Sequence, residues 1–265
     1  MSDQWLTRYG PAAIVTGASS GIGASFAKLL AAAGFDLLLV ARRLDRLQSL
    51  ADALSTEHSV EVKTLEADLS DPDAAAHIAQ AAAAMDIGLL VSNAGFGLKG
   101  PHHAQDVASL NDMINVNCVA PMQLAHHFIP ALLQRESGGI IITGSVEGIM
   151  GFPNSAAYAA SKAFVQNLGE SLWGELKAHN IDVLVLEPSS TDTEAFEKQG
   201  IDRTKLAGVM SADEVAQIGL ENLANGPVII AGEDNAALFT GLGQMPRRDA
   251  LRMMGQSMLD TLKTD

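Results

Sequence analysis

The sequence contains only one cysteine, Cys118, among 265 residues, so the chain cannot form a disulfide bond with itself. This scarcity is typical of proteins in a reducing compartment, and we expect a cytoplasmic protein. Apolar runs are also short: residues 36–41 are followed at once by two arginines, and no run approaches the roughly 18 apolar residues of a membrane span. The first ten residues lack the basic and apolar regions of an export signal, so none is predicted.

Basic side chains are scarce, since 17 lysines and arginines stand against 31 aspartates and glutamates, for a net charge of −14. This balance argues against nucleic acid or an anionic membrane as the main partner. Histidine pairs at 102–103 and 126–127 have no acidic or cysteine neighbours at the spacing of metal ligands, so we expect no metal site. Hydrophobic residues make up 48% of the chain, enough for one sizeable core.

Short apolar runs alternate along the chain with longer alanine-rich segments of helical periodicity. The runs are apolar at nearly every position, which is typical of strands buried on both faces of a parallel sheet. The alternation predicts a single α/β domain over 1–265, with a doubly wound, mostly parallel seven-stranded sheet. The predicted strands are 12–16, 36–41, 60–66, 87–92, 139–143, 181–187 and 227–231.

Two regions stand outside this alternation. Residues 189–210 follow the sixth predicted strand, and α/β proteins bind ligands at the carboxyl ends of their strands, so we expect a substrate loop there. Residues 232–265 form a C-terminal tail with four methionines, which are adaptable packing residues. We expect this tail to cover the substrate pocket or a neighbouring subunit; the alternative is a helix that covers its own core.

A glycine-rich segment, Thr16-Gly-Ala-Ser-Ser-Gly-Ile-Gly23, joins the first predicted strand to the first predicted helix. Its glycines allow the backbone to turn sharply and to approach a ligand closely. The free N–H groups and partial positive charge at the start of a helix favour an anion such as a pyrophosphate. Because it lies between a strand and a helix, the segment predicts a nucleotide-binding turn.

Tyr158 and Lys162 stand four residues apart, which places both on one face of a helix. A buried lysine beside a tyrosine favours the phenolate and lowers a pKa that is normally about 10. Such a phenol can exchange a proton with an alcohol oxygen near neutral pH. The alternative is that the two residues share a helix by chance.

Together, the glycine turn and the Tyr/Lys pair resemble the short-chain dehydrogenase/reductase family over about 12–193. Residues 16–23 match the family's T-G-x-x-x-G-x-G motif, and Asn-Ala-Gly follows the fourth predicted strand. The resemblance implies a Rossmann-like fold, a nicotinamide cofactor and a homodimer or homotetramer. It also implies a catalytic tetrad, with the serine thirteen residues before the tyrosine: Asn117, Ser145, Tyr158 and Lys162.

The resemblance gives each tetrad residue a role. Ser145 hydrogen-bonds the substrate carbonyl, and Tyr158 exchanges a proton with that oxygen as hydride arrives or leaves. Lys162 lowers the pKa of Tyr158 and hydrogen-bonds the nicotinamide ribose, while Asn117 holds a water that links Lys162 to solvent.

The family's cofactor contacts map onto residues that lie near the predicted strand ends. They are Gly17, Ser19, Ser20, Gly21, Ile22, Gly23, Arg42, Arg43, Asp68, Leu69, Asn93, Ala94, Gly95, Tyr158, Lys162, Pro188, Thr191 and Thr193. The second strand ends before Arg42-Arg43, where an NAD site usually has an acid, so we expect NADP(H) with its 2′-phosphate on Arg42 first and Arg43 second. The alternative is a solvated basic pair at a helix start.

One stretch departs from the family pattern Pro-Gly-x-Val-x-Thr, because Ser189 and Thr191 replace its glycine and valine. The serine leaves the local backbone conformation open. Substrate-side segments at 96–98, 147–152 and around Phe196 are mostly apolar, whereas Glu147 is expected at the surface or bonded within its loop.

These observations predict an NADP(H)-dependent oxidoreductase, a carbonyl reductase for a moderately hydrophobic ketone, aldehyde or secondary alcohol. Two alternatives remain: a dehydrogenase that prefers NAD(H), and a noncatalytic nucleotide-sensing protein on the same fold.

Overall fold

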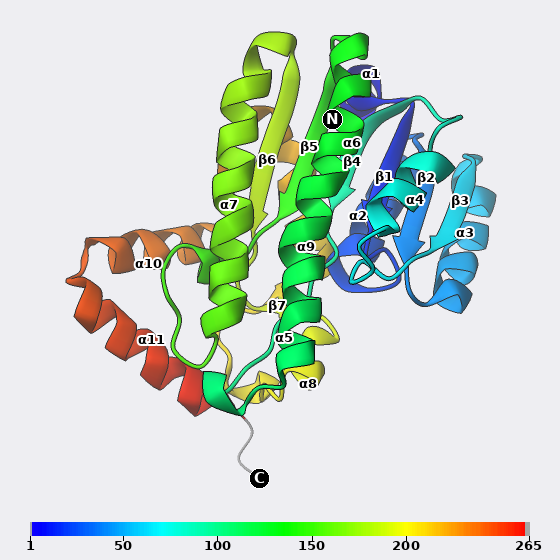
Figure 1. Ribbon diagram of the computed structural model, residues 1–265. Helices are drawn as coiled ribbons and strands as arrows, with labels where there is room; N and C mark the ends of the chain where they lie inside the picture. The colour runs from blue at the N-terminus through cyan, green and yellow to red at the C-terminus, as the bar shows by residue number, and fades with distance from the viewer. Residues whose placement is uncertain (1, 263–265) are drawn as a thin grey trace.

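The computed structural model describes residues 2–262, and seven parallel strands form its main sheet (Figure 1). The sheet order is β3-β2-β1-β4-β5-β6-β9, which reverses direction between β1 and β4. The prediction of a doubly wound parallel sheet is confirmed, although the third strand begins at residue 62 instead of 60. The strands are β1 (Ala12–Thr16), β2 (Asp36–Ala41), β3 (Val62–Glu66), β4 (Ile87–Ser92), β5 (Gly138–Thr143), β6 (Ile181–Glu187) and β9 (Val228–Ile230).

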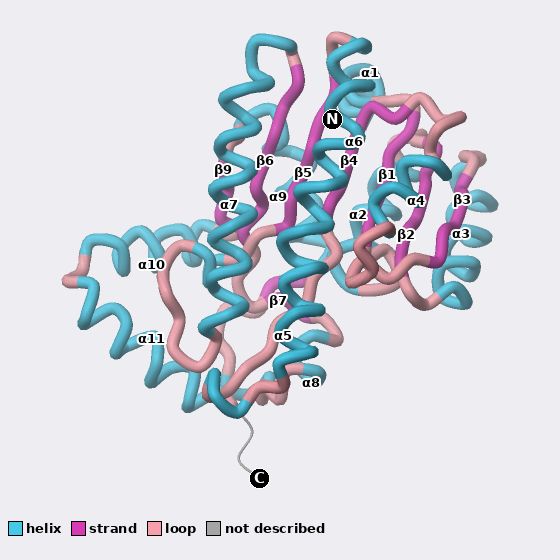
Figure 2. The backbone as a smooth tube through the Cα atoms, viewed as in Figure 1, coloured by secondary structure: helices cyan, strands magenta, loops and turns pink. Residues whose placement is uncertain are grey.

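Helices cover both faces of the sheet (Figure 2), because alternate strand residues face opposite sides. Val15 faces a core shared with α2, α3 and α9, whereas Ile14 faces a core shared with α4, α6 and α7. No helix within residues 2–262 is long and apolar enough to cross a membrane. The α-helices are α1 (Ser2–Tyr9), α2 (Gly21–Ala32), α3 (Leu44–His58), α4 (Ala74–Ala81), α5 (Val107–Ile114), α6 (Ala120–Arg135), α7 (Ala156–Leu176), α8 (Ala195–Lys198), α9 (Ala212–Asn222), α10 (Glu233–Gln244) and α11 (Arg247–Thr261).

A second, two-stranded sheet lies beyond the carboxyl ends of the main strands (Figure 1). It pairs β7 (Thr191–Asp192) with β8 (Met210–Ser211), so the predicted substrate loop between them is closed at its base. Strands of two residues are too short to leave a periodic pattern in the sequence, which is why they were not predicted.

The N-terminal helix is tied to the far part of the sheet. The Tyr9 hydroxyl donates a 2.8 Å hydrogen bond to Asp182 of β6, and Arg8 forms an ion pair with the same carboxylate at 2.5 Å. Asp182 is buried, and Lys177 lies 4.0 Å from its other carboxylate oxygen, so Arg8 and Lys177 compensate its charge while Tyr9 supplies a hydrogen bond.

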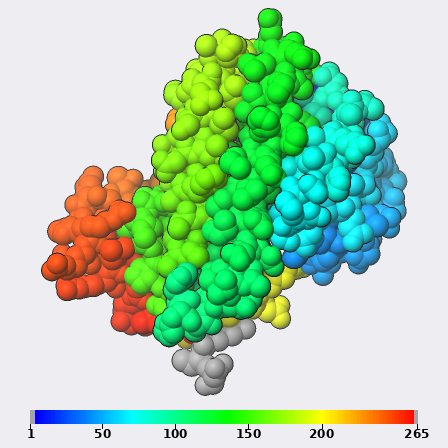
Figure 3. Space-filling model, viewed as in Figure 1, coloured from blue at the N-terminus to red at the C-terminus, as the bar shows by residue number. Residues whose placement is uncertain are grey.

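The C-terminal tail, α10 and α11, projects beside α7 (Figure 3). It forms an apolar cluster with the segment after β5, in which Phe239, Met254 and Met258 pack with Val146 and Phe152. The tail therefore supports one wall of the region where the predicted catalytic residues lie.

Candidate active site

The glycine-rich segment between β1 and α2 forms a tight turn that requires glycine. Gly17 and Gly21 have positive φ angles of 69° and 55°. A Cβ atom on Gly17 would lie 2.9 Å from the Cα atom of Ala94, and one on Gly23 would lie 2.3 Å from the carbonyl oxygen of Gly17. Ile22 anchors the turn by packing against the adjacent core. With a helix N-terminus at its end, the turn fits the pyrophosphate of a dinucleotide.

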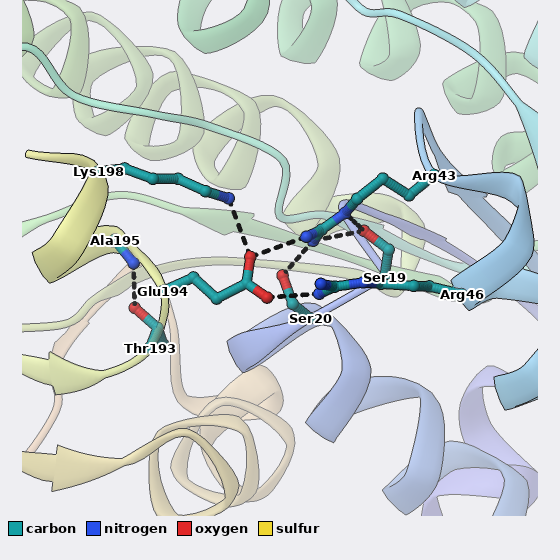
Figure 4. A network of polar contacts seen from close by, with 8 residues as sticks. All are labelled: Ser19, Ser20, Arg43, Arg46, Thr193, Glu194, Ala195 and Lys198. Atoms are coloured by element: carbon teal, nitrogen blue, oxygen red, sulfur yellow. Dashed lines mark hydrogen bonds and ion pairs between the residues drawn. The ribbon is translucent and has the colours of Figure 1, made fainter.

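Arg43 lies beside this turn and donates hydrogen bonds to both of its serines (Figure 4). Its guanidinium reaches the Oγ atom of Ser19 at 3.0 and 3.2 Å, and that of Ser20 at 2.7 Å. The same guanidinium forms a 2.8 Å ion pair with Glu194. No local pattern indicated Glu194 as a site residue, because it lies 151 residues from Arg43 along the chain.

The other residues predicted around the adenosine form a separate group. The Arg42 side chain is 69% exposed and lies 3.7 Å from the Asp68 carboxylate. Asp68 also accepts hydrogen bonds from the backbone and hydroxyl of Ser70, while Leu69 is buried. Arg43, the second choice for the 2′-phosphate in the sequence analysis, is thus the arginine that is hydrogen-bonded to the glycine turn.

Asn93 joins three neighbouring strands behind the turn. Its backbone N–H and side-chain amide bond to Thr16 of β1 at 3.0 and 3.1 Å, and its side-chain oxygen accepts a 3.2 Å bond from Thr143 of β5. A Cβ atom on Gly95 would lie 3.1 Å from Oδ1 of Asn117 and close to Lys162. The Asn93–Gly95 segment therefore connects the glycine turn to the predicted tetrad.

Tyr158, Lys162 and Ser145 converge near the carboxyl end of β5. Tyr158 and Lys162 lie on α7, with the Lys162 Nζ atom 5.7 Å from the centroid of the Tyr158 ring. Lys162 donates a 2.8 Å hydrogen bond to the carbonyl oxygen of Thr143. Ser145 accepts a 3.2 Å bond from the N–H of Glu147 and is also hydrogen-bonded to Tyr158. The phenol, the serine hydroxyl and the ammonium thus share one site.

Asn117 lies on a π-helical turn, Asn115–Val119, between α5 and α6. Its buried amide donates to the carbonyl oxygen of Phe96 at 2.9 Å and to Oγ of Ser161 at 3.0 Å, and its oxygen accepts from the Phe96 N–H at 3.1 Å. Ser161 in turn donates to the Tyr158 carbonyl oxygen at 2.7 Å. Asn117 therefore fixes this turn against α7; its predicted role in holding a water stays a prediction.

Burial sets the proton affinities of this group. It raises the pKa of Tyr158 well above the usual value, and the charge of Glu147 raises it further, whereas the hydrogen bond with Ser145 lowers it. Burial lowers the pKa of Lys162 to about 8, against the opposing charges of Cys118 and Glu147. Burial and Glu147 therefore dominate the pKa of Tyr158 in the chain by itself, and the predicted lowering of this pKa by Lys162 stays a prediction.

A second buried lysine, which the sequence did not indicate, lies against the same tyrosine ring. Lys99 is 1% exposed, and its Nζ atom is 4.6 Å from the centroid of the Tyr158 ring. It bonds both carboxylate oxygens of Glu147, at 2.6 and 2.7 Å, and the Ser155 hydroxyl at 2.8 Å. Glu147 is thus bonded between loops and is not a surface residue. A lysine in a glycine-containing loop is usually solvated, so only the fold reveals this pair.

The segment after β6 keeps an ordinary backbone despite its departure from the family pattern. Ser189 is not among the described non-glycine residues with a positive φ angle, so the replaced glycine costs no strain here. Pro188 accepts a 3.2 Å bond from the segment after β5, and Thr191 is buried in β7. Thr193 packs on the glycine turn, since a Cβ atom on Gly21 would lie 2.9 Å from its Cγ2 atom.

Known proteins resemble the chain over nearly its whole length. The family described as short chain dehydrogenase matches residues 11–204. A 7beta-hydroxysteroid dehydrogenase from Clostridium sardiniense is 33% identical over 250 residues, covering 94% of this chain and 96% of that protein. A short-chain dehydrogenase from Sphingobium yanoikuyae in complex with NADPH has a TM-score of 0.81 and 35% identity, covering 96% of this chain and 97% of its own.

A bulky-bulky ketone specific alcohol dehydrogenase from Comamonas testosteroni has a TM-score of 0.76 and 32% identity, covering 92% of this chain and 94% of its own. The family match includes the glycine turn and all four residues of the predicted tetrad. These similarities support an NAD(P)-dependent oxidoreductase. The chain belongs to the short-chain dehydrogenase/reductase family.

Proposed function

We propose that the protein is an NADP(H)-dependent carbonyl reductase that interconverts a ketone or aldehyde and an alcohol on a hydrophobic small molecule. The observation that carries this proposal is the convergence of Tyr158, Ser145 and Lys162 beside a glycine turn that fits a dinucleotide. When bound, the nicotinamide supplies or accepts a hydride. The chain's own residues bind the substrate oxygen and handle its proton.

Tyr158 is the proposed acid and base. Its raised pKa keeps the phenol protonated at neutral pH, the form that donates a proton to an oxygen on which negative charge develops. Ser145 is bonded to Tyr158 and holds the same substrate oxygen through its hydroxyl. Lys162, with a pKa near 8, takes up and releases a proton close to neutral pH and so restores the phenol, with the water predicted at Asn117 as the path.

Arg43 supports the choice of NADP(H), because its guanidinium and the hydroxyls of Ser19 and Ser20 form a compact donor set at the adenosine side. A guanidinium binds a phosphate through parallel N–H bonds. Arg43→Ala is therefore expected to weaken NADPH binding more than NADH binding, with Arg42→Ala giving the smaller effect. Equal losses for the two cofactors after either substitution would reject a 2′-phosphate role for that arginine.

One observation favours the alternative of NAD(H). Glu194 places a carboxylate 2.8 Å from Arg43, and a negative charge there disfavours a bound 2′-phosphate. Dissociation constants of the wild-type protein for NADPH and NADH, measured by calorimetry at one salt concentration, decide between the two. Tighter binding of NADH would assign the protein as an NAD(H)-preferring dehydrogenase.

Bulky apolar ketones and hydroxysteroids are the proposed substrate class. The segment after Ser145 is mostly apolar apart from Glu147 and is backed by the methionine-rich tail, which suits a large hydrophobic group. The similar proteins include a 7beta-hydroxysteroid dehydrogenase and a bulky-bulky ketone specific alcohol dehydrogenase. A panel of ketosteroids, aryl ketones, aldehydes and acyl-thioester mimics, followed by NADPH oxidation, tests this class.

Tyr158→Phe is the decisive variant, and the chain offers Tyr9→Phe as a matched control because it contains only two tyrosines. We expect Tyr158→Phe to lose at least about 100-fold in kcat, the usual contribution of a positioned acid or base, with its cofactor affinity preserved. Tyr9→Phe should keep its kcat. Substantial turnover by Tyr158→Phe would remove the assignment, and nucleotide binding without turnover of any panel compound by the wild type would support a noncatalytic protein.

A further inference from the structure

The donor groups at the adenosine side of the site already hold an anion, and that anion belongs to the chain itself. Arg43 is bonded to Ser19 and Ser20 on one side and to Glu194 on the other (Figure 4). Carboxylates and phosphates are the two groups that match the guanidinium fork. Glu194 therefore occupies a place on Arg43 that a phosphate could take.

Glu194 is held as a fully charged group. Lys198 lies 2.9 Å from its Oε2 atom, and Arg46 contacts the other carboxylate oxygen. Hydrogen bonds from Lys198, Arg46 and Arg43 lower its pKa to about 2, so it stays ionised at any working pH. The Arg43 and Glu194 side chains are 33% and 36% exposed, so solvent screens the pair and leaves it exchangeable.

The segment that carries Glu194 reaches from the glycine turn to the tyrosine. Thr193 packs on Gly21 at one end. At the other end, a Cβ atom on Gly97 would lie 3.3 Å from Nε2 of Gln199 and 3.1 Å from the Tyr158 ring. Residues 193–199 thus lie next to both the adenosine side and the catalytic side of the site.

We propose that Glu194 determines cofactor specificity by competing with the 2′-phosphate of NADP(H) for Arg43, so that this phosphate binds in exchange for the Glu194 carboxylate. NADH carries no phosphate at this position and leaves the Arg43–Glu194 pair intact. The exchange makes NADP(H) binding weaker than the donor set alone would allow, and it releases residues 194–199 from the turn. The inference rests on the proposed use of NADP(H), but the competition can be measured apart from that preference.

Glu194→Gln tests the competition, because it removes the charge and keeps the shape. Calorimetric titrations use NADPH, NADH and the two adenosine fragments 2′,5′-ADP and 5′-AMP. We expect the variant to bind NADPH and 2′,5′-ADP about tenfold more tightly than the wild type, with NADH and 5′-AMP unchanged. Glu197→Gln is the matched control, since Glu197 lies exposed on α8, the short helix that follows Glu194, and carries the same charge. It should change all four affinities by less than about twofold.

Two results would overturn the inference. Equal changes for NADPH and NADH would show that Glu194 does not sense the 2′-phosphate. Weaker NADPH binding in Glu194→Gln would show that Glu194 holds the site closed over the cofactor instead of competing with it. Tighter binding of NADH than of NADPH by the wild type would contradict the proposed function but not the exchange. In that case, a tighter affinity of Glu194→Gln for 2′,5′-ADP, with 5′-AMP unchanged, would still support the exchange.

Hydrogen exchange gives a second readout that needs no turnover. The amides of residues 198–201 bond within the Glu194 segment, and so report on its release. In the wild type, 2′,5′-ADP should speed their exchange whereas 5′-AMP should not. In Glu194→Gln, exchange should already be fast without either fragment. Unchanged or slower exchange in the wild type with 2′,5′-ADP would contradict the release.

Discussion

Glu187, the last residue of β6, makes the stability of the protein depend on pH in a defined way. The residue is 1% exposed, and its Oε1 atom is one of two buried side-chain N or O atoms without a hydrogen-bond partner among the described residues. Burial, followed by the charge of Glu170, raises its pKa from 4.5 to about 8. At neutral pH, the folded protein therefore holds a proton on this carboxyl that the unfolded chain releases.

The sign and size of the effect follow from this difference. Between pH 4.5 and 8 the folded state binds the extra proton, so the free energy of unfolding falls as the pH rises. At about 1.4 kcal/mol per pH unit, the full difference amounts to roughly 5 kcal/mol. Glu187→Gln keeps the shape and stays neutral, so this loss should disappear. We expect the variant to match the wild type near pH 4.5 and to exceed it by several kcal/mol at pH 8.

Urea unfolding at several pH values between 4.5 and 8.5 measures the difference directly, provided that the m-values agree. Glu170→Gln is the matched control: Glu170 lies exposed on α7, and its removal should reduce the pH slope only partly. A difference between wild type and Glu187→Gln that does not change with pH would refute the reasoning, because it would mean that Glu187 is already ionised in the fold.

Three further predictions concern the site and its supports. Glu147→Gln removes a charge that raises the pKa of Tyr158, so the tyrosine limb of the kcat–pH profile should move to lower pH; an unmoved limb would exclude the coupling. Tyr9→Phe deletes a hydrogen bond to the buried Asp182 and should lower the free energy of unfolding by about 1.5–3 kcal/mol, measured by urea unfolding. A decrease of less than about 0.5 kcal/mol would contradict this prediction. Gly23→Ala places a Cβ atom 2.3 Å from the carbonyl oxygen of Gly17 and should weaken cofactor binding, measured by calorimetry, at least about tenfold. An unaltered affinity would show that the turn can shift to accept the methyl group.

The parts of the fold that could be predicted are those that leave a local pattern. Parallel strands buried on both faces appear as apolar runs, so all seven main strands were found. The Tyr158/Lys162 spacing also encodes a shared helix face, and the structure places Ser145 beside it. These features depend on neighbours a few residues apart, or on strand ends that a parallel sheet brings to one edge.

The parts that could not be predicted depend on distant segments. Glu194 and Arg43 are 151 residues apart in the sequence, and Lys99 and Glu147 are 48 residues apart, so no local pattern predicts either contact. The same gap explains why the raised pKa of Tyr158 could not be predicted. Its value depends on burial and on Glu147, whereas the sequence showed only the lysine four residues away.

The contact between the N-terminal helix and β6 has a consequence for synthesis. Tyr9 and Asp182 are 173 residues apart in the sequence. Because a ribosome adds roughly 5–20 residues per second, Asp182 is synthesised about 10–30 seconds after Tyr9. During that time β1 and β2 can pair with each other, but α1 has no buried carboxylate to hold it. α1 is therefore synthesised before the strands of the sheet but is secured to β6 only after most of them have been made.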